Sequence, residues 1–194
     1  GHRGVKNLAP ENTIESIHLA SKLGLSWVEI DVKISKDFIP ILLHDETLDR
    51  TTNGKGKPTH YNYSELKKLD AGIKFYKNKT EIFVPSLKDV LLFSKKNKIN
   101  LNIELKPNKG FEIKNVKAIA KLFKDFNFKN QYFFSSFDWP SLFAMKEFIP
   151  EAYYCPLIDK FSHDVSLSDI IEVCDKYNFN FCGFNKNILN HDVL

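Results

Sequence analysis

Short runs of β-branched and aromatic residues recur along the chain, and the stretches between them have apolar residues at helical spacing. Such runs predict strands, and apolar positions three and four residues apart predict helices. Strands are expected at 27–32, 39–43, 100–105, 131–135, 152–155 and 179–184, and Gly1-His2-Arg3 has the character of a strand end. Helices are expected at 13–23, 64–69, 87–97, 114–126 and 167–177.

The alternation of strands with helices of this length indicates parallel βαβ units and an α/β fold. A closed TIM (β/α)₈ barrel needs eight strands and typically about 250 residues. This chain has 194 residues, and six strands plus the opening segment are visible. We therefore expect one barrel domain over residues 1–194 with its last βα unit missing from this chain. An open, doubly wound sheet is the alternative.

One stretch departs from the βα pattern. Residues 45–85 contain a single segment with helical spacing and are too long for an ordinary βα loop. We interpret them as an insertion that passes over one face of the barrel.

Charge and composition narrow the possible partners. The formal net charge is +4, and the lysines are spread along the chain, whereas a nucleic-acid surface concentrates them. No apolar run approaches the roughly 18 residues of a membrane span, so neither nucleic-acid binding nor stable membrane insertion is expected. The cysteines are odd in number and form no CxxC pair, which argues against a disulfide framework or a cysteine zinc site and favours a cytoplasmic location.

Two acidic residues, Glu29 and Asp31, lie two positions apart on a predicted strand. Side chains alternate along a strand, so both carboxylates face the same side. Two like charges on an apolar strand are costly unless a positive charge lies between them, and a divalent cation such as Ca²⁺ or Mg²⁺ prefers oxygen ligands. A solvated strand end with ion-pair partners is the simpler interpretation of the same pattern.

The polar residues Asn102, Glu104 and Lys106 repeat this alternation at the end of another predicted strand. In a barrel, the carboxyl ends of the strands surround one pocket. Glu104 is then expected to be a third metal ligand, and Lys106 a cation that holds a phosphate. A half-exposed antiparallel strand would explain the pattern without any site.

Histidines mark two further predicted strand ends, where His2 precedes Arg3 and His44 precedes Asp45. A lone histidine is more often structural, but two that face one pocket can act as acid and base near neutral pH. Arg3 offers a planar fork of donors that matches a phosphate. The other histidines are interpreted as structural or surface residues: His18, His60, His163 and His191.

These residues belong to an ordered series of motifs between residue 1 and about residue 140. The motifs are HRG at 2–4, APENT at 9–13, ExD at 29–31, HD at 44–45, LDRTTNGxG at 48–56, LxxLDAG at 66–72, VPSL at 84–87, ExK at 104–106 and SSF at 135–137. The series resembles the signature of the glycerophosphodiester phosphodiesterase family, within the phospholipase C-like phosphodiesterase barrel superfamily. Members of that family usually also carry a WTVN-like motif on a later strand, which this chain does not contain.

The resemblance implies a role for each candidate residue and a reaction. The implied metal ligands are Glu29, Asp31 and Glu104, the general acid and base are His2 and His44, and the substrate-binding residues are Arg3, Lys106 and Glu11. The family hydrolyses glycerophosphodiesters to glycerol 3-phosphate and an alcohol, by attack of a neighbouring glycerol hydroxyl through a cyclic phosphate. A related phospholipase-type phosphodiesterase and a non-catalytic phosphate-binding protein are the alternatives.

Overall fold

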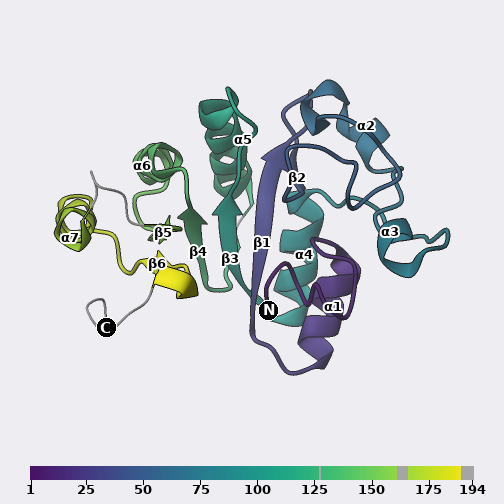
Figure 1. The fold of residues 1–194 in the computed structure, drawn as a ribbon, viewed down its shortest axis with the longest axis horizontal. Helices are drawn as coiled ribbons and strands as arrows, with labels where there is room; N and C mark the ends of the chain where they lie inside the picture. The colour runs from purple at the N-terminus through teal and green to yellow at the C-terminus, as the bar shows by residue number, and fades with distance from the viewer. Residues whose placement is uncertain (127, 161–165, 189–194) are drawn as a thin grey trace.

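The computed structural model describes residues 1–126, 128–160 and 166–188. Within them, six strands form one sheet in the order β2-β1-β3-β4-β5-β6 (Figure 1). The strands are Trp27–Ile34 (β1), Pro40–Leu42 (β2), Asn100–Leu105 (β3), Tyr132–Ser136 (β4), Tyr153–Ile158 (β5) and Gly183–Phe184 (β6). His163 and His191 lie outside the described residues.

The sheet is parallel from β1 to β6, as the βα alternation predicts. From β1 to β6 the parallel strands also follow one another in chain order, without the reversal at which a doubly wound sheet changes direction. This succession is that of a TIM barrel of which the described residues form part, so the predicted fold class is confirmed. Figure 1 shows α1 and α4 beside β1, and α6 and α7 beside β5 and β6.

The strand predicted at 39–43 was expected to be a parallel barrel strand, and that expectation is wrong. β2 pairs antiparallel with β1, with Val32 opposite Leu42. The two strands are joined by a short turn in which Ser35 N donates to Ile39 O at 3.0 Å. A parallel connection needs a crossover of a dozen or more residues, so a link of this length permits only a hairpin.

The opening segment is strand-like only at its first residue. The amino group of Gly1 donates to Trp27 O at 2.7 Å, and Gly1 O accepts from Glu29 N at 2.7 Å, which is the pattern of parallel pairing with β1. Residues 2–8 form turns, so the predicted strand end at Gly1-His2-Arg3 is only partly correct.

The longer helices agree with the predicted ranges, with one addition. They are Ile14–Lys22 (α1), Leu87–Asn97 (α4), Glu112–Asp125 (α5), Trp139–Phe148 (α6) and Leu167–Lys176 (α7). Ser86 caps α4 by accepting from Asp89 N, as its position predicts. The addition is α6, which lacks a clear apolar face and begins instead with Asp138 as N-cap and a proline in its first turn.

The insertion at 45–85 contains three short helices where one was expected. They are Pro58–His60 (η1), Tyr63–Leu66 (α2) and Ile73–Tyr76 (α3), and a further short helix, Lys186–Ile188 (η2), follows β6. The insertion packs around a second, smaller core, in which Leu48, Leu66 and Val84 contact Ile41 of β2. It therefore packs as a compact unit beside β2.

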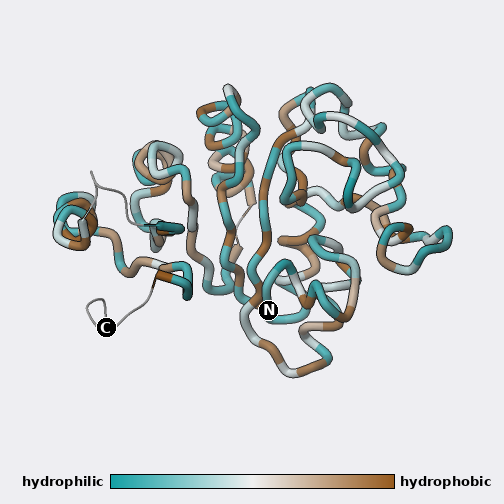
Figure 2. Tube along the Cα trace, viewed as in Figure 1, coloured by the Kyte–Doolittle hydropathy of each residue, from teal (hydrophilic) through white to brown (hydrophobic). Residues whose placement is uncertain are grey.

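The main core lies between the sheet and the surrounding helices. On β1, the even-numbered residues Val28, Ile30 and Val32 are at most 1% exposed and belong to this core. The odd-numbered residues face the opposite side, which is the inside of the barrel. Figure 2 shows apolar and polar positions alternating along β1. No helix in the described part of the chain is both long enough and apolar enough to cross a membrane.

Candidate active site

Three carboxylates meet on the inner side of the sheet. Glu29 and Asp31 project from β1, and Asp31 lies in register with Glu104 on β3. One oxygen of each carboxylate lies within 4.8 Å of the others. Asp31 is fully buried and Glu104 is 7% exposed. The structure therefore brings together the three predicted metal ligands, as the alternation of side chains along the two strands requires.

The cluster is electrostatically strained when nothing positive lies inside it. Burial, reinforced by the charge of Asp31, raises the pKa of Glu29 to about 8. The same two causes raise the pKa of Glu104. Glu29 Oε1 and Asp31 Oδ1 are buried and have no hydrogen-bond partner among the described residues. Orphaned carboxylate oxygens in a group of three are a donor set that fits a hard divalent cation.

Asn12 holds Asp31 in place, a role that the sequence did not suggest. Asn12 Nδ2 donates to Asp31 Oδ2 at 2.8 Å, and Asn12 Oδ1 accepts from Asp31 N at 3.0 Å. The backbone of Asn12 has a φ of 56°, a left-handed conformation that asparagine tolerates better than most residues. The available signal was its place in the APENT motif, directly after Glu11.

The turn after Gly1 presents His2 and Arg3 to the acidic cluster. Arg3 N donates to Glu29 Oε2 at 2.7 Å, and Arg3 Nε lies 3.3 Å from Asp31 Oδ2. His2 Nε2 lies 3.7 Å from Glu29 Oε2, and its side chain is 55% exposed. Partial burial, followed by the charges of Lys6 and Arg3, lowers the pKa of His2. The imidazole is thus neutral at neutral pH and open to a ligand.

His44 and Asp45 follow β2 and form a second pair. His44 Nδ1 lies 2.7 Å from Asp45 Oδ1. The hydrogen bond from Arg50 holds the pKa of Asp45 well below its usual range, so the carboxylate is ionised and accepts a hydrogen bond from His44 Nδ1–H. This leaves His44 Nε2 for a ligand. His44 also affects the pKa of both His2 and Glu104, though less than burial does, as expected for a residue that shares their pocket.

Two lysines complete the inner surface above the carboxylates. Lys106 Nζ donates to Glu104 Oε1 at 2.9 Å and lies 3.7 Å from Asp31 Oδ1. Lys33, which is 1% exposed, donates through Nζ to Lys106 O at 2.9 Å. Burial lowers the pKa of Lys33 to about 8. Sequence reasoning missed Lys33, although it continues the alternation begun by Glu29 and Asp31.

Glu11 lies at the edge of this group, between two arginines. Its Oε1 accepts from Arg3 Nη1 at 2.9 Å, and its two oxygens accept from Arg50 Nη2 at 2.7 Å and Nη1 at 2.9 Å. Burial opposes ionisation of Glu11, but the bonds and charges of both arginines outweigh it and lower the pKa. Nearby, a cavity of about 250 Å³ is lined in part by Glu104, Lys106 and Phe137.

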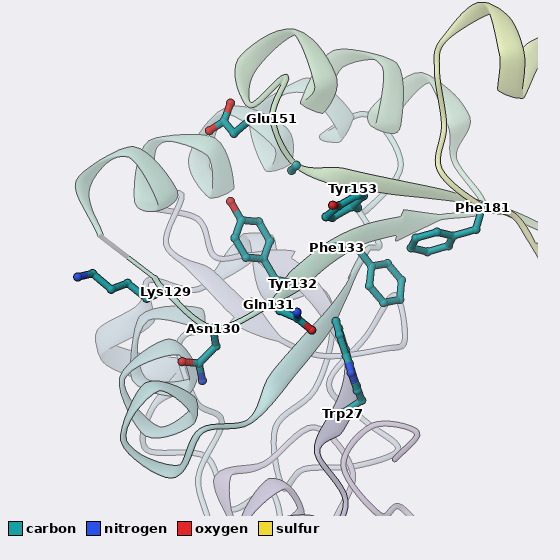
Figure 3. A pocket seen from close by; sticks show the side chains of 10 residues that line it. Trp27, Lys129, Asn130, Gln131, Tyr132, Phe133, Glu151, Tyr153 and Phe181 are labelled. Atoms are coloured by element: carbon teal, nitrogen blue, oxygen red, sulfur yellow. The ribbon is translucent and has the colours of Figure 1, made fainter.

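A larger cavity, of about 580 Å³, lies at the amino ends of the strands, away from the carboxylates. Figure 3 shows Trp27, Phe133 and Phe181 lining it, and their rings are in contact, with centroids 5.5 Å and 4.9 Å apart. Its charged lining residues are Lys129 and Glu151. It offers no cluster of acid–base or metal-binding groups, so the smaller, polar pocket is the better candidate for chemistry.

One known protein family matches nearly the whole chain. The glycerophosphoryl diester phosphodiesterase family matches residues 2–182. The glycerophosphodiester phosphodiesterase of Caldanaerobacter subterraneus subsp. tengcongensis is 38% identical over 167 residues, which cover 81% of this chain and 67% of that protein. The enzyme of the same name from Bacillus altitudinis is 35% identical over 154 residues, with 77% and 61% covered. The chain thus spans about two thirds or less of the length of these relatives.

Among solved structures, the chain resembles an Oleispira antarctica phosphodiesterase in complex with its product sn-glycerol-3-phosphate. The TM-score is 0.89 and the identity 32%, and the match covers 98% of this chain and 75% of that one. A Thermotoga maritima glycerophosphodiester phosphodiesterase matches with a TM-score of 0.73 and 29% identity over 95% of this chain and 71% of that one.

Proposed function

The chain belongs to the glycerophosphoryl diester phosphodiesterase family, and we propose that it hydrolyses a glycerophosphodiester to glycerol 3-phosphate and an alcohol. The observation that carries this proposal is the meeting of three carboxylates with the cations of Arg3 and Lys106 in one pocket. The product bound to the Oleispira relative supports glycerol 3-phosphate as the product here.

We further propose that one divalent cation, Ca²⁺ or Mg²⁺, is held by Glu29, Asp31 and Glu104. The support is the fit between a hard cation and three converging carboxylates, two of which have orphaned buried oxygens. When bound, such a cation neutralises charge on the phosphate and its leaving oxygen. It would also relieve the repulsion that raises the pKa of Glu29 and Glu104.

In the proposed complex, Arg3 and Lys106 bind the phosphate. The guanidinium of Arg3 is aligned by Glu11 and Asp31, and the ammonium of Lys106 is aligned by Glu104. Each cation is therefore already oriented before a substrate arrives. A planar fork and a point charge hold the phosphodiester from different directions, which limits its rotation in the pocket.

Proton transfer is assigned to His2 and His44. One imidazole removes the proton from the glycerol hydroxyl beside the phosphate as that oxygen bonds to phosphorus. The other donates a proton to the departing alcohol oxygen as its bond to phosphorus breaks. Water then opens the cyclic phosphate, again with one histidine as base and the other as acid. The overall change is addition of one water across the phosphodiester.

Hydrolysis of glycerophosphocholine by the purified chain tests the proposal. We expect glycerol 3-phosphate to form in the presence of Ca²⁺ or Mg²⁺, and no product after treatment with EDTA. Asp31→Asn should abolish turnover, whereas Glu15→Gln, on the exposed side of α1, should not. Binding of glycerol 3-phosphate without turnover would favour a non-catalytic phosphate-binding protein. Cleavage of a lysophospholipid in preference to glycerophosphocholine would favour the phospholipase-type alternative.

A further inference from the structure

Arg50, in the insertion that follows β2, bridges two carboxylates that are distant in sequence. On one side, Nη1 and Nη2 donate to Glu11 Oε2 and Oε1 at 2.9 and 2.7 Å. On the other side, Nε and Nη2 donate to Asp45 Oδ2 and Oδ1 at 2.6 and 2.9 Å. Both edges of the guanidinium plane are thus used, each in a two-bond contact with one carboxylate.

Each of these carboxylates has a second partner in the pocket. Glu11 Oε1 also accepts from Arg3 Nη1 at 2.9 Å, and Asp45 Oδ1 also contacts His44 Nδ1 at 2.7 Å. A continuous chain of contacts therefore runs from Arg3 through Glu11, Arg50 and Asp45 to His44. Its two ends are the phosphate-binding arginine and one of the two acid–base histidines of the proposed reaction.

We propose that Arg50 is a positioning residue, which fixes Arg3 and His44 relative to each other. This inference rests on the proposed function for its kinetic consequence. Arg50 reaches the reacting groups only through Glu11 and Asp45, which the guanidinium plane holds in one fixed arrangement. The N-terminal turn that carries Arg3 and the segment before His44 are each anchored to β1, through Arg3 N to Glu29 Oε2 and Leu43 N to Asp31 O. Arg50 adds the side-chain bridge that sets the orientation of the two functional groups relative to each other.

The arrangement needs an arginine rather than a positive charge alone. A guanidinium presents donors along two edges of a rigid plane, whereas an ammonium is a single point that cannot make two paired contacts at once. Isolated exposed ion pairs contribute little, but paired contacts within a network are the exception. Here Glu11 and Arg3 have side chains only 14% and 13% exposed, while Arg50 closes the network from the outer, 47% exposed side.

The kinetic test is a double-mutant cycle on glycerophosphocholine hydrolysis. Arg50→Ala should lower kcat/KM by about 10²-fold, the effect of misplacing reacting groups by around 1 Å. Asp45→Asn should also lower it, and the double variant should be little worse than the poorer single variant, because both changes break the same chain of contacts. If the fold-losses in kcat/KM of the two single variants multiplied in the double variant, the proposal would be overturned.

Two further variants separate positioning from charge and from loop stability. Arg50→Lys should remain within about threefold of Arg50→Ala, since the fork is lost. Thr52→Val removes two hydrogen bonds within the same loop, one that Thr52 Oγ1 donates to Leu48 O and one that it accepts from Gly54 N. Neither bond belongs to the network of Arg50. Thr52→Val should lower Tm with kcat/KM close to wild type. A fully active Arg50→Lys enzyme, or a Thr52→Val enzyme as impaired as Arg50→Ala, would contradict the proposal.

A readout without turnover keeps the inference independent of the proposed function. In ¹⁵N NMR, with His44 assigned by its loss in His44→Gln, wild-type His44 should carry its proton on Nδ1, facing Asp45. Arg50→Ala should give a mixture of tautomers, because Asp45 is no longer held. If the wild-type chain were inactive but Arg50→Ala still changed the tautomer of His44, only the proposed function would be rejected. An unchanged tautomer would reject the role of Arg50.

Discussion

Asn12 holds Asp31 at both its side chain and its backbone, donating to Oδ2 at 2.8 Å and accepting from N at 3.0 Å. Asn12 does this from a left-handed backbone, with a φ of 56°. The segment before α1 is thereby tied to the central carboxylate of the site, and the orientation of Asp31 depends on a residue from outside the sheet.

Substitution of Asn12 should therefore cost stability for two separable reasons. Asn12→Ala loses hydrogen bonds to a buried carboxylate, at about 1.5–3 kcal/mol. It also adds about 1–2 kcal/mol for a left-handed alanine. Asn12→Gly loses only the bonds, so it should be the milder of the two by urea denaturation. If the glycine variant were as unstable as the alanine variant, backbone strain would not contribute.

The raised pKa of Glu29 predicts an unusual pH dependence of stability in the absence of divalent cations. Between its ordinary value of 4.5 and about 8, folded Glu29 keeps a proton that the unfolded chain releases. Stability present below pH 4.5 is then lost as the pH rises towards 8. We expect Tm in EDTA to fall across this range in wild type, and to fall less in Glu29→Gln. Equal slopes would show that Glu29 is not the group responsible.

Addition of Ca²⁺ or Mg²⁺ should reverse that loss. A cation that binds only the folded chain stabilises it by about 2.7 kcal/mol at a concentration 100 times its Kd. Tm at pH 8 should rise with cation concentration in wild type and stay constant in Glu104→Gln. Glu147→Gln, at an exposed position of α6 and away from the pocket, is the matched control and should respond like wild type. A cation response that survives in Glu104→Gln would place the binding elsewhere.

Removal of either histidine should affect the chemical step more than substrate binding. His2→Ala or His44→Ala should lower kcat by about 10²–10⁴-fold, the usual contribution of a positioned acid or base, with a small change in KM. His60→Ala, an exposed histidine of the insertion, serves as control. Near wild-type kcat in one variant would remove that histidine from the mechanism.

Lys33 provides a test in which stability should change with pH in the opposite direction to that predicted for Glu29. Its pKa falls from 10.5 to about 8 on burial, so between these values the unfolded chain binds the proton that the folded chain has released. Stability is then gained as the pH rises from 8 to 10.5, and lost as it falls. Lys33→Met should be less dependent on pH over this range than wild type. If the denaturation midpoints of wild type and Lys33→Met changed by the same amount over this pH range, the assignment would be contradicted.

Much of the site was predictable because one simple rule places it. Alternation along a strand puts Glu29 and Asp31 on one side, and the parallel pairing of β1 with β3 adds Glu104 to them. The partners of Arg50 were not predictable in this way. Glu11 lies 39 positions from Arg50, and no local pattern links a turn before α1 to a loop of the insertion.

The errors in the fold have equally specific causes. The apolar run that forms β2 reads the same whether its partner is parallel or antiparallel, and only the short turn from Ser35 to Ile39 decides between them. Helix α6 was missed because its apolar residues are spread around its circumference, so periodicity gave no signal. Its start at Asp138 was visible only as a cap followed by proline.

The alternation along β1 also bears on how this protein can change during evolution. Ile30 and Val32 pack outward against helices, while their neighbours Glu29 and Asp31 point into the pocket. Mutations in adjacent codons should therefore have different physical effects: a change at Ile30 or Val32 alters the packing of the core, and a change at Glu29 or Asp31 alters the charge of the pocket.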